Sequence, residues 1–234
     1  VPPMLQGHHP AHYADHIAAN GFEKHHDVLA YERALVDELG HDAPIPDGLR
    51  EVADKCDIEG LVVRRARWRS MRHDLLAAHE VFNEASQTVP DTRPMARESF
   101  LALGRLYLAF ADAELLQVAF VGDEPIGFAA AFPEVNEAIQ AVEGRLFPLG
   151  WLRGALALGT VKTAAFKLIG VKQAWRHRGL SAVLICNVVE GAQRAGYTRV
   201  DGSVIDERNK TMRNIVEQAG LDVWRRYRFF QREI

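Results

Sequence analysis

The sequence predicts an α/β fold, with a mixed, twisted sheet and flanking helices. In the second half of the chain, strand patterns alternate with helix patterns, an order typical of parallel strand pairs. Before them, two apolar runs surround the turn at Gly122–Pro125, which predicts an antiparallel hairpin. The late strands are joined through a cationic, glycine-bearing turn, Arg176–Gly179, that runs into a helix with an apolar stripe.

Hydrophobic periodicity and the positions of glycine and proline predict the individual elements. The expected order is one strand, two helices, the hairpin, a mixed insertion, then strand, helix, strand, helix and strand. The helix after Gly179 is the clearest, because five apolar residues share one face and Gly196 follows as a stop. The expected ranges are 61–68, 69–86, 97–112, 114–133, 134–158, 163–171, 180–195, 199–206, 209–220 and 223–231.

The beginning of the chain has the same layout as its end. Residues 1–36 predict a short helix, a break at Gly21 and a strand, which is also the layout of residues 209–231. We therefore expect residues 1–36 to be the C-terminal remnant of a first domain of the same kind. A linker over 37–57 and a main domain over 58–234 complete the predicted organisation, because prolines and glycines are frequent in 37–57.

The composition is that of an ordinary globular protein, with 48% hydrophobic and 25% charged residues. The formal net charge of −3 makes nucleic acid an unexpected partner. Basic residues interrupt the longest apolar stretch, so no membrane partner is expected, and we expect a cytoplasmic protein. No metal site is expected either, because Pro10 interrupts the histidines near the N-terminus.

The turn before the helix at Leu180 has the features of an anion site. Helix N-termini leave backbone N–H groups unpaired and partly positive, and a glycine lets an anion approach them. Arg176 and Arg178 add fixed positive charge. The alternative is an ordinary strand–helix turn with solvated arginines.

Two motifs in the C-terminal part resemble those of the GNAT (Gcn5-related N-acetyltransferase) superfamily. The run Arg176-His177-Arg178-Gly179-Leu180-Ser181 is similar to the family's R/Q-x-x-G-x-G/A motif. The family's later motif is matched by Asn209 and, at the family's spacing after it, by Met212, Val216, Gly220 and Leu221. The resemblance covers about residues 58–232, and residues 1–36 look like the end of a preceding domain in a tandem bacterial protein.

The resemblance implies a GNAT acyl-CoA N-acyltransferase fold with acetyl-CoA, or another acyl-CoA, as co-substrate. It implies direct transfer of the acyl group to a small amine or an amino acid derivative. The residues implied to bind the pantetheine arm are Ile169, Gly170 and Val171, and those implied to bind the pyrophosphate are Arg176, His177, Arg178, Gly179, Leu180 and Ser181. Asn209 is expected to face the pantetheine or its thiol end.

The proton-transfer groups are open at this point. Asp201, Ser203, Asp206 and Glu207 lie on or just past the 199–206 strand, and of these Asp206 and Glu207 are the candidate bases. Tyr227 is a candidate acid. Solvated or packing roles are the alternatives. Val216 stands where many family members have a tyrosine, so a catalytically degenerate binding or partner module remains a second hypothesis. A transferase with an aminoacyl-tRNA donor is a third.

The insertion at Gly144–Leu158 is rich in apolar and aromatic residues. It predicts either an apolar acceptor pocket, a cover for the core or a subunit contact, so a homodimer is possible in principle. The acceptor, the acyl chain and the oligomeric state are not determined by the sequence.

Overall fold

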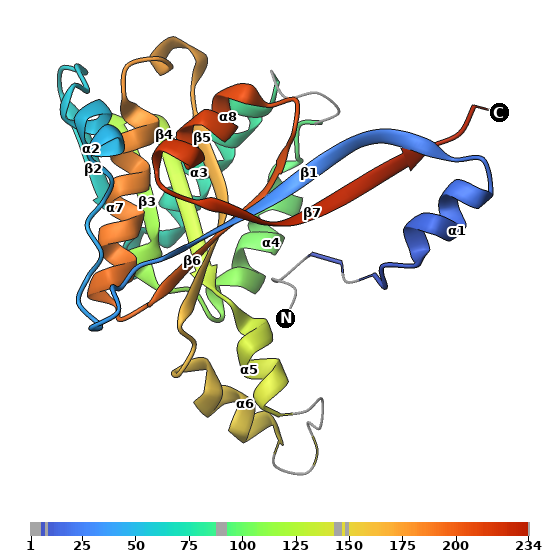
Figure 1. Cartoon of the computed structure of the whole chain (residues 1–234). Helices are drawn as coiled ribbons and strands as arrows, with labels where there is room; N and C mark the ends of the chain where they lie inside the picture. The colour runs from blue at the N-terminus through green and yellow to red at the C-terminus, as the bar shows by residue number, and fades with distance from the viewer. Residues whose placement is uncertain (1–5, 8, 88–92, 143–146, 148–149, 234) are drawn as a thin grey trace.

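The computed structural model describes residues 6–7, 9–87, 93–142, 147 and 150–233, and it confirms the predicted α/β class. These residues form one seven-stranded sheet in the order β2-β3-β4-β5-β6-β1-β7 (Figure 1). Neighbouring strands are antiparallel except β5 and β6, which are parallel. The strands are β1 (Glu23–Ala34), β2 (Leu61–Arg65), β3 (Leu116–Val121), β4 (Glu124–Pro133), β5 (Thr163–Val171), β6 (Arg199–Asp206) and β7 (Asp222–Gln231).

Helices cover both faces of this sheet. A side chain at Gly127 would meet Leu180 and Leu184 of α7, whereas one at Gly170 would meet Ala85 of α3, so these helices lie on opposite faces. The helices are α1 (Tyr13–Ala19), α2 (Asp47–Asp54), α3 (Met71–Ser86), α4 (Arg97–Leu108), α5 (Val135–Ala141), α6 (Gly150–Leu158), α7 (Leu180–Arg194) and α8 (Lys210–Gln218). Three short 3₁₀ turns are η1 (Trp68–Ser70), η2 (Ala113–Leu115) and η3 (Gln173–Trp175).

The predicted apolar stripe of α7 lies in the main core. Leu180, Leu184 and Val188 are fully buried and belong to a cluster that includes Ile126 of β4 and Leu115. Burial of this stripe fixes α7 across β3, β4 and β5, and therefore fixes the turn that precedes it.

Two predicted elements are shorter than expected. The strand predicted over 61–68 ends at Arg65, because the backbone then turns into η1. The helix predicted over 97–112 ends at Leu108, and the side chain of Asp112 accepts a hydrogen bond from the backbone of Glu114 at the start of η2. In both cases a local cap or turn replaces the last residues of the predicted element.

The strand predicted near the N-terminus is β1, which lies between β6 and β7. Pairing runs from Val28–Ala34 to β6 and from Glu23–Glu32 to β7. Helix α2 falls within the predicted linker and packs on α7, with Leu49 buried. Whether residues 1–36 are the remnant of another domain is not tested by this arrangement and stays a prediction.

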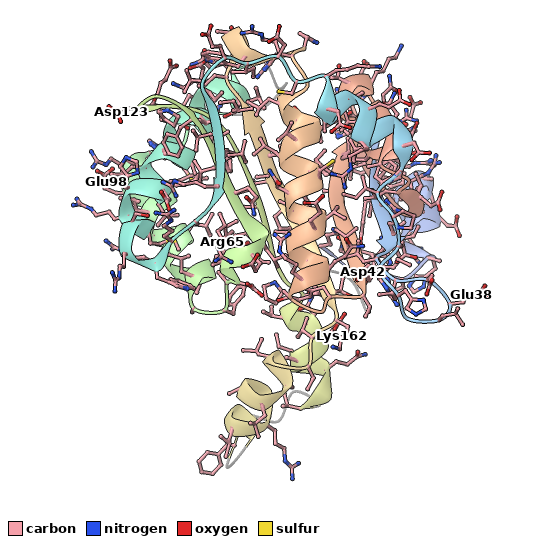
Figure 2. The ribbon with its side chains drawn as sticks, turned by 90° about the vertical axis from the view of Figure 1, so that its left-hand side faces the viewer. Glu38, Asp42, Arg65, Glu98, Asp123 and Lys162 are labelled. Atoms are coloured by element: carbon pink, nitrogen blue, oxygen red, sulfur yellow. The ribbon has the colours of Figure 1, made fainter. Side chains whose placement is uncertain are left out.

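Two parts of the chain project from the body. Beyond the sheet, β1 and β7 continue as a two-stranded ribbon toward α1 (Figure 1). The insertion between β4 and β5 forms a helical hairpin of α5 and α6, which extends below Lys162 (Figure 2). Leu149 of this insertion lies outside the described residues.

Candidate functional site

The parallel strands β5 and β6 separate partway along their length. They pair from Thr163–Phe166 to Arg199–Gly202, and no further pairing between them follows in the described part of the chain. Beyond this point, β5 pairs only with β4, up to Val171, and β6 pairs with β1, up to Asp206. The edge of β5 that carries Ile169, Gly170 and Val171 therefore offers backbone groups to a ligand in the split.

The predicted anion loop lies at the wide end of this split. It follows the carboxyl end of β5, where ligands of open α/β sheets generally bind. His177 and Gly179 have positive φ angles of 62° and 84°, so residues with positive and negative φ angles alternate along the loop. Backbone N–H groups from His177 to Ser181 have no acceptor among the described residues, which makes a concave set of donors at the start of α7.

Gly179 is required by packing as well as by its φ angle. A Cβ atom there would lie 2.7 Å from the carbonyl oxygen of Val52 and 3.1 Å from the Cα of Cys56. Val52 of helix α2 and Cys56, which follows this helix, therefore pack directly against the loop, and this contact restricts the conformation of the loop.

The two arginines of the loop have different surroundings. Arg176 donates from Nε to the carbonyl of Val171 at 3.1 Å and from Nη2 to the carbonyl of Ala85 at 3.0 Å. It therefore ties the loop to β5 and to α3. Arg178 is exposed and lies over the indole ring of Trp175, 5.5 Å from the ring centroid. Of the two, Arg178 is the one whose position suits contact with an anion.

Asp201 lies at the narrow end of the split. It pairs with Ala165 of β5, one residue before the last pair of the two strands. A side chain at its neighbour Gly202 would meet Tyr31 and Leu221, so Asp201 points to the face opposite α8. Its side chain is 3% exposed, Oδ2 accepts from Trp224 Nε1 at 3.2 Å, and Oδ1 has no partner among the described residues.

Burial raises the pKa of Asp201 to about 6. Lys167 of β5 opposes this rise, whereas the carboxylates of Glu134 and Glu32 add to it. The same burial lowers the pKa of Lys167. A buried carboxyl group with an unused oxygen and a pKa near neutrality is suited to take a proton from a ligand.

The candidate proton-transfer residues from the sequence have partners of their own. Asp206 forms an ion pair with Arg208 at 2.6 Å, which lowers its pKa to about 2. Glu207 is held by Lys24, which lowers its pKa, and accepts from the backbone of Asp27. Tyr227 donates to Gln6 at 3.0 Å. Their roles remain predictions, and the geometry favours Asp201 because Asp206 and Glu207 are weak bases in these pairs.

Comparison with known proteins gives two relatives of similar sequence. The chain is 28% identical over 241 residues to the bacterial ceramide synthase of Caulobacter vibrioides. It is 25% identical over 239 residues to protein YghO of Escherichia coli K12. Each match covers 100% of this chain, which spans only about 60% of the length of these curated relatives (61% and 60%). No protein-family model matches the chain.

Solved structures decide the fold. A GCN5-related N-acetyltransferase from Sphaerobacter thermophilus superposes with a TM-score of 0.60 at 18% identity, covering 94% of this chain and 56% of that one. The chain has the GNAT fold. A tandem GNAT protein from the clavulanic acid biosynthesis pathway gives a TM-score of 0.56 at 13% identity, covering 98% of this chain and 60% of that one. The fold that the two sequence motifs predicted is thereby confirmed.

The second motif of the GNAT resemblance has structural roles in this chain. Asn209 caps α8, since its Oδ1 accepts from the backbone of Met212 at 3.1 Å. Val216 is buried in the core under α8 and brings no hydroxyl group to the split. The predicted contact of Asn209 with a thiol carrier stays a prediction, although the residue does follow the carboxyl end of β6.

Two surface hollows of the GNAT fold lie away from Asp201. One, of about 450 Å³, lies by the base of the α5–α6 hairpin and contains Asp112, Lys162 and Tyr197. The other, of about 580 Å³, runs along α3 and contains His79 and Asn83. Neither hollow includes a residue of the split. The candidate site is therefore defined by the separation of β5 from β6 and by the unpaired polar groups along it.

Proposed function

We propose that the protein transfers an acyl group from an acyl-CoA to a primary amine. The observation that carries this proposal is the split between the parallel strands β5 and β6, with a set of unpaired amides at its wide end. A buried carboxyl group at its narrow end supplies a proton acceptor. The split thus joins an anion site to a base along one path.

The residues of the split fit the chemistry of a CoA thioester. A diphosphate needs several donors in a concave arrangement, and the N–H groups from His177 to Ser181 provide them beside the positive charge of Arg178. A pantetheine arm carries amide groups, which match the free backbone edge of β5 at Ile169–Val171. An extended arm between these strands would bring its thioester toward Lys167 and Asp201.

The reaction would be direct attack of the amine on the thioester carbon. Asp201 would accept one proton from the amine, either directly or through water, because Oδ1 is available and the pKa near 6 leaves it ionised above neutrality. Backbone N–H groups on the free edge of β5 would polarise the carbonyl oxygen. The C–S bond breaks as the C–N bond forms, and the leaving thiolate, with a pKa near 8.5 for an ordinary thiol, takes up a proton from water.

For the acceptor, we propose a long-chain amino alcohol in preference to the small amine expected from the sequence. The Caulobacter relative is named a ceramide synthase, and ceramide is an N-acylated long-chain amino alcohol. An acceptor of this class needs an apolar surface near the base, and Trp224 beside Asp201 offers one. A fatty acyl-CoA is then the expected donor, with acetyl-CoA as the alternative.

The test combines ligand binding with turnover. Unfolding midpoints are measured with CoA and acyl-CoAs of increasing chain length; ligand at ~100 times its Kd adds ~2.7 kcal/mol. Thiol release is then followed with long-chain amino alcohols and with short amines. No stabilisation by any acyl-CoA would refute the proposal. Stabilisation without thiol release or amide formation would instead favour the degenerate binding module.

Arginine variants locate the diphosphate. Arg178→Ala is expected to weaken CoA binding several-fold, and more at low salt, because one exposed cation is lost beside the phosphates. Arg105→Ala, at an exposed arginine on α4, is the matched control and is expected to leave affinity unchanged. Equal affinities for the two variants would show that the loop is not the anion site.

A further inference from the structure

Lys167 lies at the narrow end of the split, where β5 and β6 separate. The last pair of these two strands is Phe166 with Gly202, so Lys167 is the first residue of β5 beyond it. On the other side of β5, the register with β4 shifts between Ala130 and Ala131 and leaves Lys167 without a partner, as the extra residue of a β-bulge. Bulges of this kind re-aim a side chain out of the regular alternation of a sheet.

The Lys167 ammonium group is a half-buried cation without a close partner. It forms no hydrogen bond or salt bridge with any residue in the described part of the chain. By contrast, Lys172, just after the same strand, pairs with Glu80 at 2.6 Å and with Glu124 at 3.1 Å. An ammonium group carries three N–H donors, and burial without partners is costly. These donors therefore suit an anionic group of a ligand.

Two buried carboxylates balance the charge of Lys167 without occupying its donors. Burial lowers the pKa of Lys167, and the charges of Asp201 on β6 and of Glu134 beside α5 oppose this change. These carboxylates accept hydrogen bonds from Trp224 and from the backbone of Asn136, respectively. The ammonium group thus lies near the candidate base but is not bonded to it.

The order of groups along the split identifies the anion. The unpaired amides from His177 to Ser181 lie at the wide end, and the free edge of β5 runs from Val171 back to Lys167. These four residues of extended strand span about 13 Å. A carrier with its diphosphate on the amides and its arm along this edge brings its opposite end, the sulfur, to Lys167. Negative charge develops on that sulfur when the thioester is cleaved.

We propose that the Lys167 ammonium group stabilises the sulfur of CoA as a thiolate. The inference rests on the proposed acyl transfer and assigns a group to the leaving end of that reaction, where Val216 supplies no hydroxyl. As the C–N bond forms, the electron pair of the C–S bond passes to the sulfur and Asp201 takes the amine proton. The negative charge beside Lys167 thus moves from the carboxylate to the sulfur. Lys167 keeps its own proton, and the thiolate takes one from water.

The thiol pKa of bound CoA distinguishes this role from a structural one. A lysine that only neutralised Asp201 and Glu134 would have no effect on the sulfur, whereas an ammonium group close to a thiol lowers the thiol pKa. The two carboxylates act in the opposite direction in every variant of Lys167, so the difference between variants reports the ammonium group. The measurement uses free CoA alone, and follows the ultraviolet absorbance of the thiolate as pH rises.

Lys167→Met is the test variant, because it keeps the aliphatic stem and removes the charge. It is expected to raise the thiol pKa of bound CoA by about one unit or more, and to weaken CoA binding about tenfold above that pKa. Binding of desulfo-CoA, which lacks the sulfur, is expected to be unchanged. Lys167→Arg retains the charge and is expected to resemble the wild type.

Lys162→Met is the matched control. Lys162 is exposed and lies at the base of the α5–α6 hairpin, before β5 begins and outside the split (Figure 2). Its replacement is expected to change neither the thiol pKa nor the affinity for either ligand. Thermal unfolding without ligand checks that each variant is folded, and Lys167→Gln replaces Lys167→Met if the latter does not unfold cooperatively.

The outcomes separate this inference from the proposed function. CoA binding with the same thiol pKa in the wild type and in the neutral Lys167 variant would overturn the inference and leave the acyl transfer standing. A wild type that binds neither CoA nor desulfo-CoA would refute both. Acylation of Lys167 itself, found by peptide mass after incubation with acyl-CoA, would also overturn the inference, because that reaction needs the neutral amine and removes the charge.

Discussion

The indole of Trp224 donates a 3.2 Å hydrogen bond to Oδ2 of Asp201, and this contact leaves Oδ1 of the same carboxylate without a partner among the described residues. Trp224 comes from β7 and Asp201 from β6, with β1 between them in the sheet. The carboxylate is therefore oriented by one neighbour, and its second oxygen is available for a proton.

The first prediction concerns activity as a function of pH. The folded-state pKa of Asp201 is raised to about 6, so the fraction able to accept a proton grows as pH rises from 5 to 7. We expect kcat/KM for the acyl-transfer reaction to rise over this range and then level off. Asp201→Asn is expected to abolish this rise with pH (the acidic limb of the profile) and to lower kcat/KM by about 10²–10⁴-fold.

Asp206→Asn serves as the comparison for that experiment. Its carboxylate is already paired with Arg208 and has a pKa of about 2, so its removal is expected to leave the limb near pH 6 in place. A pH limb that persists in Asp201→Asn and disappears in Asp206→Asn would reverse the assignment of the base.

The second prediction concerns stability at the same residue. A raised folded-state pKa means that the folded protein holds this proton more tightly than the unfolded chain does. The associated stability is present below pH ~4, the ordinary range of Asp, and is lost as pH rises through about 6. The loss amounts to about 3 kcal/mol, because one pKa unit corresponds to about 1.4 kcal/mol.

Asp201→Asn lacks this titration and keeps an oxygen for the Trp224 hydrogen bond. We therefore expect the free energy of unfolding of the variant, relative to that of the wild type, to be about 2–3 kcal/mol higher at pH 7.5 than at pH 4, as measured by urea unfolding at both values. A constant difference at the two pH values would mean that Asp201 titrates in its ordinary range. Gain of stability together with loss of activity would be the signature of a group held charged for function.

The sequence was sufficient to predict the features of the split that depend on local patterns. The apolar stripe of α7, the positive run before it and the hairpin at Gly122 all follow from residues near one another in the chain, and each was found where expected. The loop at Arg176–Gly179 is in place because most of α7, including Leu180, Leu184 and Val188, is buried in the core. Local signals of this kind survive folding largely unchanged.

The features that were missed depend on pairing over long distances in the chain. Asp201 gains its burial and its Trp224 contact from a β1 strand that inserts between β6 and β7, and no local pattern shows this register. Arg176 has the same charge in the sequence as Arg178, yet it bonds two carbonyl groups, one of them from α3. Asp206 and Glu207 stay predictions, but each is paired with a cation, Arg208 and Lys24 respectively, and Lys24 is 183 residues from Glu207 in the chain.

The third prediction separates the two reasons for a glycine at position 179. Gly179 and Gly196 have almost equal φ angles of 84° and 83°, but a Cβ at Gly196 would meet nothing within 4 Å. Gly196→Ala is therefore expected to cost about 1 kcal/mol of stability from backbone strain alone. Gly179→Ala is expected to cost clearly more, about 2–4 kcal/mol, because its Cβ also meets the Val52 carbonyl at 2.7 Å.

Thermal unfolding of the two glycine variants measures this difference, and CoA titration shows its effect on the loop. We expect weaker binding for Gly179→Ala only, since α2 must shift to make room beside the donor amides. Equal destabilisation of the two variants would indicate that the α2 contact relaxes without cost.

The fourth prediction concerns the ribbon of β1 and β7. Asp27 is fully buried and accepts from Arg228 at 2.8 Å, with Lys24 and Arg226 also within salt-bridge distance. Hydrogen bonds from Arg228 hold its pKa well below the usual range. A lowered pKa contributes stability above pH ~4 that is lost as pH falls further, because the proton binds the unfolded chain more readily.

Asp27→Asn is therefore expected to destabilise the protein by about 1–3 kcal/mol at pH 7, because the charge-assisted hydrogen bonds from the exposed cations to this buried side chain are weakened. The deficit should shrink as pH falls from 4 toward 2, because the carboxyl group takes up its proton in the unfolded wild-type chain over this range while it stays ionised in the folded protein. Glu51→Gln is the control, because its ion pair with Lys55 at 3.6 Å is exposed and contributes little. If urea unfolding at pH 7 gave the same small change for both variants, the Asp27 cluster would have no special part in holding the ribbon, and the burial of that carboxylate would need another cause.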